Sequence, residues 1–562
     1  MDQSIERGID LGVRAQESSV RMIFAPGEQL RMPPYQRSYS WEAKEANELL
    51  TDLIDSAETG TPHFVGAIVL IHGSENGVLE IVDGQQRLTT LTILLAVLRD
   101  LETDKARAAA LHALIADDAR PILGEGANWR LTLNHMDGPF FRDTIQTPGA
   151  TRTLDKEPSE PVESESQQRM VRNASAFVSR IKDMTDEERR SLADMVMNHC
   201  ALVRVVVGDK EQGFKVFRVL NTRGKEPDAH DIIKTELFQR ARFSDEEASA
   251  YSERWAEHEA ALGGSAFDDL LRQIRSIYDK SGKGELISAF PKAVLSRVEP
   301  RKFLDDVLPR YVEAYRLITT GEVQDGPNAK IISDKLNQMR ALDQNSWRAP
   351  ALKFLVERGA SDQKAPEFFS LLERLSYVIM LVISERDQRN RRFNKVVDAI
   401  SSDRVLFAKN GPFAIDRSEA KKTRERMLGR FATFGQRRAM ALRLNAALEG
   451  GVTYPPESDA TVEHVLPRNI HEESHWLTVW PDPAKRREQC DTLGNFVLLT
   501  HKVNQKADRQ DYRAKKEVYF NGGGGMDFAL TRDLQDQDAW TADVVRKRTD
   551  MLVDILCDEW GI

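Results

Sequence analysis

Cysteines and long apolar runs are scarce in this chain. The three cysteines, Cys200, Cys490 and Cys557, lie far apart, so they match no zinc-ligand spacing and argue against a disulfide framework. No uninterrupted apolar run approaches the roughly 20 residues of a membrane-spanning helix, since the longest candidate, 88–98, is interrupted by threonines. Residues 1–14 carry acidic side chains and no apolar stretch, which argues against a signal peptide. These absences predict a cytoplasmic protein that does not associate with membranes.

An excess of positive charge is also absent. The formal net charge is -9, from 79 Lys and Arg against 88 Asp and Glu. A protein that simply coats nucleic acid is usually basic, so any contact with nucleic acid has to come from local patches. The chain also lacks a Walker A sequence and a Gly-x-Gly-x-x-Gly string, so it offers neither common nucleotide-binding loop.

The length of 562 residues exceeds the roughly 250–300 that one hydrophobic core supports, which predicts two or three domains. Apolar runs at 64–71 and 78–82, joined by a turn, predict a β-hairpin, and a helical pattern follows from Leu88. Helical spacing of apolar residues continues through the middle of the chain. We therefore expect a mainly helical α+β multidomain protein divided into residues 1–245, 246–410 and 411–562.

The string Asp83–Gly84–Gln85–Gln86–Arg87 joins an apolar strand directly to a long helix. Gly84 permits a sharp turn and a close approach of a ligand to the backbone. The helix start offers free N–H groups and a positive dipole end, which suit a phosphate, and Arg87 adds a second anion contact. Asp83 is an acceptor for a ribose hydroxyl or a metal. The structural alternative is that Asp83 caps the helix and Gly84 turns the chain.

Two other strings of the first block stand out. Gln36 and Arg37 follow Pro34–Tyr35, and an Asn221–x–Arg223–Gly turn precedes a helix that carries Lys234. The second string adds groups that suit a phosphate. The alternatives are turn chemistry for Asn221 and a solvated surface position for Lys234.

Three strings near the C-terminus predict a small ββα unit. Glu463 and His464 end one strand, Asn495 precedes the next strand, and Asn504 lies on or just before a helix. Phosphodiester hydrolysis requires a base, and histidine titrates near neutrality. Carboxylate and amide oxygens are ligands that Mg²⁺ prefers. Because adjacent strand residues point to opposite sides, Glu463 and His464 face one ligand only if the strand bends.

Each C-terminal string also has a structural alternative. Glu463–His464 fits an exposed strand end, and Leu493–Gly494–Asn495 fits a simple turn before a strand. His501 is a competing ligand because it lies close to Asn504 in the sequence.

Taken in order, these strings resemble the GmrSD family of type IV, modification-dependent restriction systems, in its single-chain form. The N-terminal strings resemble the family's ParB/sulfiredoxin-like domain, which binds and hydrolyses nucleoside triphosphates. The C-terminal strings resemble its His-Me finger, HNH-like nuclease domain. The nucleotide-binding residues implied by the resemblance are Gln36, Arg37, Asp83, Gly84, Gln85, Gln86, Arg87, Asn221, Arg223 and Lys234.

For the nuclease domain, the resemblance implies His464 as the general base. Glu463 and Asn504 would hold Mg²⁺ or another divalent cation, and Asn495 would orient the base or support its loop. A basic run lies just before this domain. Its Arg437 and Arg438 are expected to contact DNA phosphates, and the alternative is a solvated helix face.

These expectations combine into an NTP-regulated endonuclease that cleaves foreign, modified double-stranded DNA of phages. Residues 1–245 would bind the nucleotide and regulate the nuclease, 246–410 would connect the two domains, and 411–562 would cleave the DNA. The nucleotide is left open between GTP, ATP and others, and so is a homo-oligomer. Two alternatives belong to other classes: a nucleotide-switched DNA-binding clamp without cleavage, and a toxin nuclease that acts on host DNA or RNA.

Overall fold

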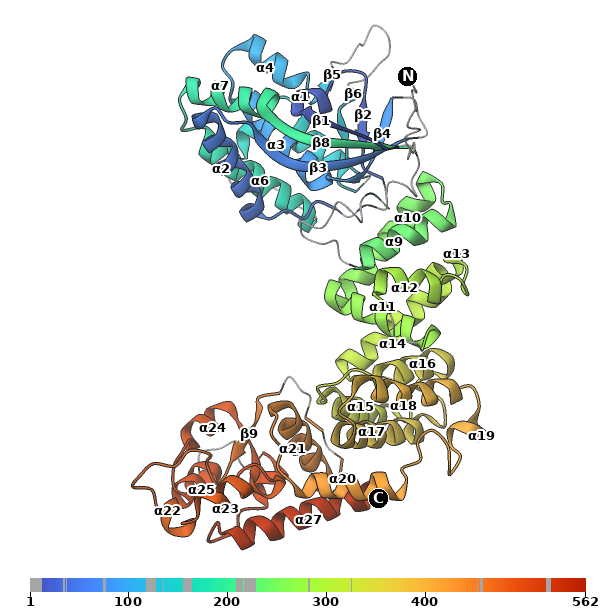
Figure 1. Ribbon diagram of the computed structural model, residues 1–562, viewed down its shortest axis with the longest axis vertical. Coiled ribbons are helices and arrows are strands. Elements are labelled where there is room, and N and C mark those ends of the chain that lie inside the picture. Colours follow the sequence, from blue (N-terminus) through green and yellow to red (C-terminus); the bar gives the residue numbers. More distant parts are fainter. Residues whose placement is uncertain are drawn as a thin grey trace, which may run out of the picture. The chain divides into compact units, whose positions relative to one another are not determined.

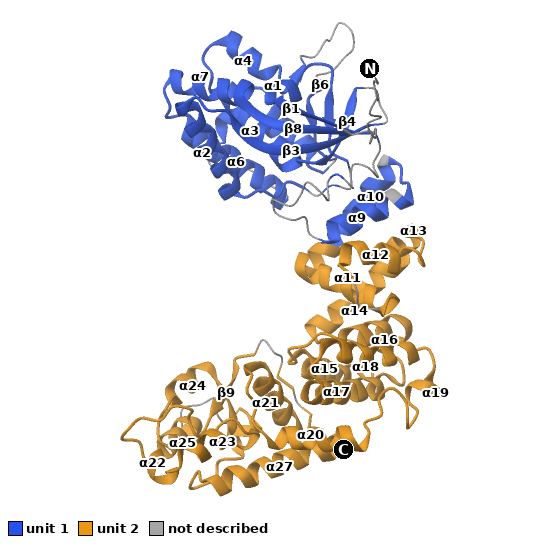
Figure 2. Cartoon of the chain, viewed as in Figure 1, with its two compact units in different colours: residues 1–257 blue, residues 258–562 orange. Residues whose placement is uncertain are grey.

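The computed structural model divides into two compact units, Met1–Glu257 and His258–Ile562 (Figure 2). Among the described residues, no helix combines the length and apolarity that crossing a bilayer requires. The structure describes residues 13–562 with the exception of 34–35, 37, 74–76, 118–127, 135, 155–163, 209–215, 217–228, 281–283, 325, 452, 455–457 and 522–526.

A six-stranded sheet forms the centre of the first unit (Figure 1). In spatial order its strands are β1 (Val13–Ser19), β8 (Cys200–Val207), β3 (His63–His72), β4 (Val78–Asp83), β2 (Gln29–Arg31) and β7 (Leu131–Thr132). β3 pairs antiparallel with β4, which confirms the predicted hairpin. β3 pairs parallel with β8, and β4 with β2, so the sheet is mixed.

Both faces of the central strands are buried. Ile68 and Leu70 of β3 belong to the large core formed with the helices, whereas the alternate residues Val69 and Ile71 belong to a second apolar cluster. This two-sided burial explains why these strands read as continuous apolar runs. The longest helices of the large core are α2 (Ala43–Thr59), α3 (Gln85–Leu101), α6 (Glu165–Ile181) and α7 (Asp186–Asp194).

α3 is buried along nearly its whole length. It contains the longest apolar run of the sequence and is thus a core helix. Two of the threonines that interrupt the run fit this environment because their hydroxyls bond to the preceding turn: Thr90 Oγ1 donates to the carbonyl of Gln86 (2.8 Å) and Thr92 Oγ1 to that of Leu88 (2.9 Å).

A buried ionic cluster lies at the C-terminal end of α3. The Asp100 carboxylate pairs with Arg99 (2.7 Å) and accepts hydrogen bonds from the Gly149 amide (2.8 Å) and from the Thr151 amide and hydroxyl (3.1 and 2.7 Å). Burial opposes ionisation of Asp100, but these bonds hold its pKa below the ordinary value. The cluster ties the loop around residue 150 to the core helix.

The second unit begins with helices that pack on one another. α14 (Leu308–Thr320) packs on α16 (Arg348–Arg358), and α15 (Ala329–Arg340) packs on α17 (Ala365–Val382). The ring of Phe354 stacks on that of Phe368, with centroids 3.9 Å apart. This region confirms the helical bundle that the apolar spacing predicts. Its other long helices are α11 (Gly264–Tyr278) and α18 (Arg386–Ala399).

The C-terminal block of the second unit surrounds a two-stranded antiparallel sheet (Figure 1). The strands are β9 (Ala460–His464) and β10 (Phe496–Thr500). The longer helices are α20 (Arg417–Leu428), α21 (Phe434–Leu448), α23 (Pro483–Gln489), α24 (His501–Ala507), α25 (Tyr512–Asn521) and α27 (Ala542–Trp560), and the short ones are α22 (Trp476–Val479) and α26 (Ala529–Arg532). Its core includes the three tryptophans Trp476, Trp480 and Trp540.

A buried arginine joins this block to the helices before it. Arg443 of α21 is fully buried and pairs with Glu373 of α17 (2.7 Å) and Glu559 of α27 (2.5 Å). Arg374 of α17 donates to the carbonyl of Trp560 (3.1 Å). Within this unit, α17, α21 and α27 thus share one ionic centre.

Candidate functional site

Gly84 makes the turn from β4 into α3 in the first unit. Its φ of 95° lies in the left-handed region, and a Cβ at this position would lie 2.4 Å from Cγ2 of Ile68. Only glycine fits here without displacing β3. Gly84 itself, and not Asp83, is the N-cap residue of α3. Of the structural alternative, the role of Gly84 as the turn residue is therefore confirmed, whereas Asp83 does not occupy the N-cap position.

The segment that contains Gln36, Ser40 and Trp41 folds onto this turn. The Gln36 side-chain amide donates to the carbonyl of Val82 (3.1 Å), and Gln86 Oε1 accepts from the amides of Ser40 (2.8 Å) and Trp41 (3.3 Å). These bonds satisfy buried backbone groups of two segments that are far apart in sequence. Gln36 and Gln86 thus hold the turn together, whatever else they bind.

Arg87 and Asp83 are the partly exposed members of the string, at 24% and 21% of their side-chain surface. Arg87 Nη1 donates to the carbonyl of Ala67 (2.9 Å) and lies 3.9 Å from Asp83 Oδ2. The guanidinium rests against Gly66, where a Cβ would lie 3.2 Å from Arg87 Nε. Gly66 also lies beside an irregularity in the pairing of β3 with β8.

Gln85 and Lys234 are buried. Gln85 Oε1 has no hydrogen-bond partner among the described residues, and Lys234 lies 5.8 Å from the centroid of the Phe238 ring. The alternative of a solvated surface position for Lys234 is therefore wrong. Arg37, Asn221 and Arg223 lie outside the described residues.

In the second unit, β9, β10 and α24 follow one another in the order that the sequence predicts. His464 ends β9 and pairs in register with Phe496, the first residue of β10. Their rings meet edge to face with centroids 5.2 Å apart. β10 runs directly into α24, which carries Asn504.

One pocket of about 390 Å³ brings three of the expected residues together. Glu463, His464 and Asn504 all line it. The other lining residues are Pro467, Arg468, Asn469, His501, Gln505, Asp508 and Arg509. Adjacent strand positions 463 and 464 therefore share one pocket at the strand end. His501, the competing ligand, lies in the same pocket.

Asn495 does not line this pocket. It is fully buried, and its Oδ1 accepts from the Leu466 amide (2.8 Å) and Trp540 Nε1 (2.9 Å), while its Nδ2 donates to the carbonyls of Leu466 (3.0 Å) and Cys490 (2.8 Å). All four bonds fix backbone or core groups around the segment after His464. This placement matches the expected support of the loop and gives Asn495 no direct access to a substrate.

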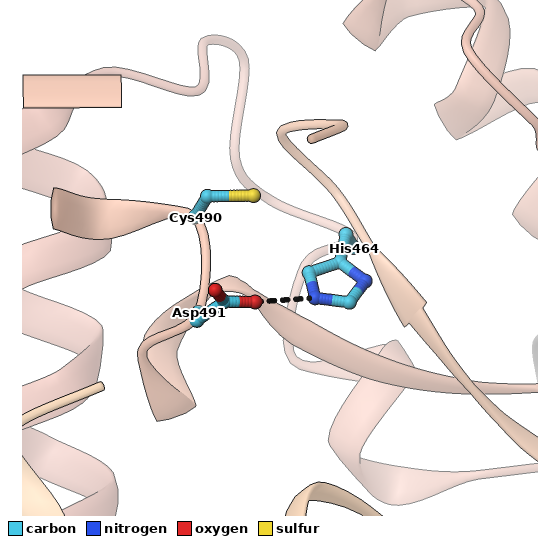
Figure 3. Close-up of side chains that lie close together, drawn as sticks. All are labelled: His464, Cys490 and Asp491. Carbon is cyan, nitrogen blue, oxygen red and sulfur yellow. Dashed lines mark hydrogen bonds and ion pairs between the residues drawn. The ribbon is translucent and has the colours of Figure 1, made fainter. Parts of the chain in front are cut away.

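The imidazole of His464 points at Asp491 (Figure 3). Its Nε2 lies 3.2 Å from Asp491 Oδ1, and the buried thiol of Cys490 lies beside both groups. Burial and the positive charge of Arg468 lower the pKa of His464 to about 4, against the hydrogen bond to Asp491, which raises it. The ring is thus neutral at physiological pH, the state that accepts a proton.

The cluster of His464, Cys490 and Asp491 has donor atoms within 4.8 Å of one another, but its surroundings do not suit a cation. Asp491 already lies within 4.0 Å of the guanidinium groups of Arg430, Arg437 and Arg468. Burial also raises the pKa of the Cys490 thiol to about 12, which disfavours the thiolate that binds metals.

Oxygen donors suited to a divalent cation lie instead in the pocket. Asn504 Nδ2 donates to Thr461 Oγ1 (2.9 Å) and the carbonyl of Val462 (3.4 Å), which leaves its amide oxygen for a ligand. Glu463 and Asp508 supply carboxylates. Glu463 is also paired with the buried Lys515, which donates to the His464 carbonyl as well (2.8 Å). Burial raises the pKa of Glu463, and Lys515 opposes that shift.

Arg437 does not lie at the surface, where a contact with DNA phosphates was expected. It is buried, and its Nη1 donates to the carbonyls of Phe431 (3.0 Å) and Ala432 (2.8 Å). Because its guanidinium donates to these two carbonyls, Arg437 stabilises the loop before α21. It does not face a ligand at the surface. Arg438, its neighbour, is partly exposed.

Sequence reasoning missed Asp491, Arg468 and Lys515. Arg468 follows the His464–x–x–Pro467 string directly, and Asp491 stands four positions before Asn495. Nothing in their spacing indicates that a side chain 27 residues from His464 contacts its ring.

A neutral histidine beside oxygen donors and arginines in an open pocket supplies the groups that hydrolysis of a phosphodiester requires. Two family models match the chain: GmrSD restriction endonuclease, N-terminal domain, over residues 20–238, and GmrSD restriction endonucleases, C-terminal domain, over residues 416–555. The chain belongs to the GmrSD family of restriction endonucleases. No curated protein matches it.

Proposed function

We propose that the chain cleaves foreign, modified double-stranded DNA with His464 as the general base. The observation that carries this proposal is the shared pocket of Glu463, His464 and Asn504. The His464 ring is neutral, its Nε2 is held by Asp491, and its Nδ1 is left to accept the proton of an attacking water. An oriented base of this kind contributes about 10²–10⁴-fold to such a reaction.

A divalent cation, with Mg²⁺ as the first choice, completes the site. When bound, it neutralises charge on the phosphate and on the leaving oxygen. Asn504, Glu463 and Asp508 are the residues that would hold it, because their oxygens line the pocket. The ion pair of Glu463 with Lys515 keeps that carboxylate in place, and Asn495 keeps the loop after His464 in its conformation.

The first unit, in this proposal, binds a nucleoside triphosphate (GTP, ATP or another) and regulates cleavage. The start of α3 supports this, because its backbone N–H groups lie beside the partly exposed Arg87 and Asp83. The buried Gln85 oxygen without a partner among the described residues is a second supporting feature. Hydrolysis of the nucleotide is part of the same proposal.

Plasmid and phage DNA cleavage by wild type and His464→Ala tests the enzyme assignment. We expect wild type to cut modified DNA in the presence of Mg²⁺ and one NTP, and His464→Ala to lose cleavage while it keeps DNA binding. His475→Ala, an exposed histidine of the same block, is the control and should cut as wild type does.

The same DNA panel separates the alternatives. Binding without cleavage by wild type would indicate a nucleotide-switched clamp, and cleavage of plain host DNA or RNA would indicate a toxin. Unchanged cleavage by His464→Ala would contradict the proposed base.

A further inference from the structure

Asp491 is the hub of a positively charged cluster at the edge of the nuclease pocket. Its side chain is 8% exposed, and three guanidinium groups surround it. Arg468 donates through Nε (2.9 Å) and Nη2 (2.5 Å) to Oδ1, and Arg430 donates through Nη2 (3.0 Å) to Oδ2. Arg437 Nη1 lies 4.0 Å from Oδ1.

The charges of this cluster do not cancel. One carboxylate faces three guanidinium groups, which leaves an excess of positive charge. Arg437 is buried and bonded to backbone carbonyls, so it stabilises the loop. The remaining positive charge sits on Arg430 and Arg468, whose side chains are 55% and 45% exposed. The cluster therefore presents a fixed positive surface to solvent.

The arginines are also held in place before any ligand arrives. A guanidinium has five N–H donors in one plane, and the bonds to Asp491 use only some of them. The backbone amide of Phe431 donates to the Asp491 carbonyl (2.8 Å), which fixes the loop that carries Arg430. A preordered guanidinium loses less rotational freedom on binding and matches phosphate oxygens in a bidentate manner.

We propose that Arg430 and Arg468 bind two backbone phosphates of the DNA substrate beside the scissile one. Arg468 lines the same pocket as His464, so a phosphate bound to it lies next to the reacting position. Asp491 links the binding of these phosphates to the orientation of the base, because it contacts both arginines and the His464 ring. This inference rests on the proposed nuclease function and adds the residues that position its substrate.

The test measures binding of a fluorescein-labelled DNA duplex to the full chain with His464→Ala, so that cleavage does not interfere. Arg430→Gln and Arg468→Gln should each reduce the slope of log affinity against log salt concentration by about one, and the double variant by about two. The loss should be the same for different DNA sequences, because phosphate contacts carry no sequence information.

Arg316→Gln is the matched control. Arg316 is a bidentate partner of Glu313 with 41% of its side chain exposed, and it lies in the helical region. Its salt slope should equal that of the parent. Unchanged slopes in both Arg430→Gln and Arg468→Gln, an equal fall in Arg316→Gln, or a parent that fails to bind the duplex at low salt would each overturn the proposal. Failure of the proposed nuclease function shows separately, as cleavage that persists in His464→Ala.

Discussion

The two motif-bearing regions of this chain use their polar side chains in opposite ways. In the first unit, Gln36 and Gln86 turn inward and bond to backbone groups around the start of α3. In the C-terminal block, Glu463, His464 and Asn504 line an open pocket. The Asp83–Arg87 string lies where β4 runs directly into α3, and Asn504 lies on α24, which directly follows β10. A short motif at such a junction can thus be a folding element, a ligand site, or both, and spacing alone does not separate these roles.

Among the changes considered, Asn504→Ala in the C-terminal pocket should have the largest effect, and this effect should be on DNA cleavage. Loss of the amide oxygen removes a proposed cation ligand, so cleavage should fall on the order of 1,000-fold, the scale of losing one transition-state contact. The fold should change little, because the bond to Thr461 is partly exposed. Cleavage rates across a Mg²⁺ titration, with the melting temperature, check this. Asn521→Ala, at an exposed asparagine that ends α25 and does not line the pocket, is the control.

Gly84→Ala should act on the fold of the first unit. Because φ is 95° and a Cβ would lie 2.4 Å from Ile68, we expect the free energy of unfolding to fall by about 3 kcal/mol. Hydrogen exchange of the α3 amides measures it. Gly60→Ala has a φ of 69° with nothing within 4 Å, and it should cost only about 1 kcal/mol. Equal effects of the two changes would show that Gly84 serves only the backbone conformation and not the close approach of β3.

The adjacent glutamines offer a sharper comparison within one helix turn. Gln86→Ala leaves the amides of Ser40 and Trp41 without their acceptor and should cost about 2 kcal/mol. Gln85→Leu removes an oxygen that has no partner among the described residues, so it should leave stability intact and weaken binding of ATP or GTP. Calorimetric titration with both nucleotides checks the second part. Unchanged nucleotide affinity would assign Gln85 to packing alone.

Acid should reveal the smallest of these effects, at Asp100. Since its folded pKa is lowered, the ionised carboxylate stabilises the fold above its unfolded pKa of about 3.9, and this contribution is lost as pH falls through the folded pKa. Asp100→Asn should therefore be less stable than wild type by about 1 kcal/mol at pH 7, with the gap closing towards pH 3. The pKa of Asp143 is lowered too, by its hydrogen bond to Arg142, but this pair is exposed to solvent, so Asp143→Asn should show a smaller pH-dependent gap than Asp100→Asn. Urea unfolding at both pH values measures the difference.

The sequence predicted those parts of the fold that depend on neighbours in the chain. The β3–β4 hairpin, the start of α3 after Gly84, and the order β9, β10, α24 all follow from local patterns. The same local order brought Glu463, His464 and Asn504 to one pocket, because a strand end and the next helix are close in any ββα unit.

Contacts between residues that lie far apart in the sequence could not be predicted from it. Lys515 meets Glu463 across 52 residues and Arg468 meets Asp491 across 23, and no periodicity records such pairings. Burial also overturned one expectation and one alternative. Arg437, expected to contact DNA, is buried, and so is Lys234, for which a solvated surface position was the alternative. The sequence gives the number of basic side chains in a segment, but tertiary packing determines which of them are exposed to solvent.

The burial of Arg443 limits how the nuclease block can be separated from the rest of its unit. A fragment that starts at residue 411 would keep Glu559 but lose Glu373, and it would leave a guanidinium without one of its two counterions in a dry interior. The carbonyl of Trp560 would lose Arg374 at the same cut. An isolated cutting module should therefore begin upstream of α17, and shorter pieces should be insoluble or partly unfolded even though every catalytic residue is present.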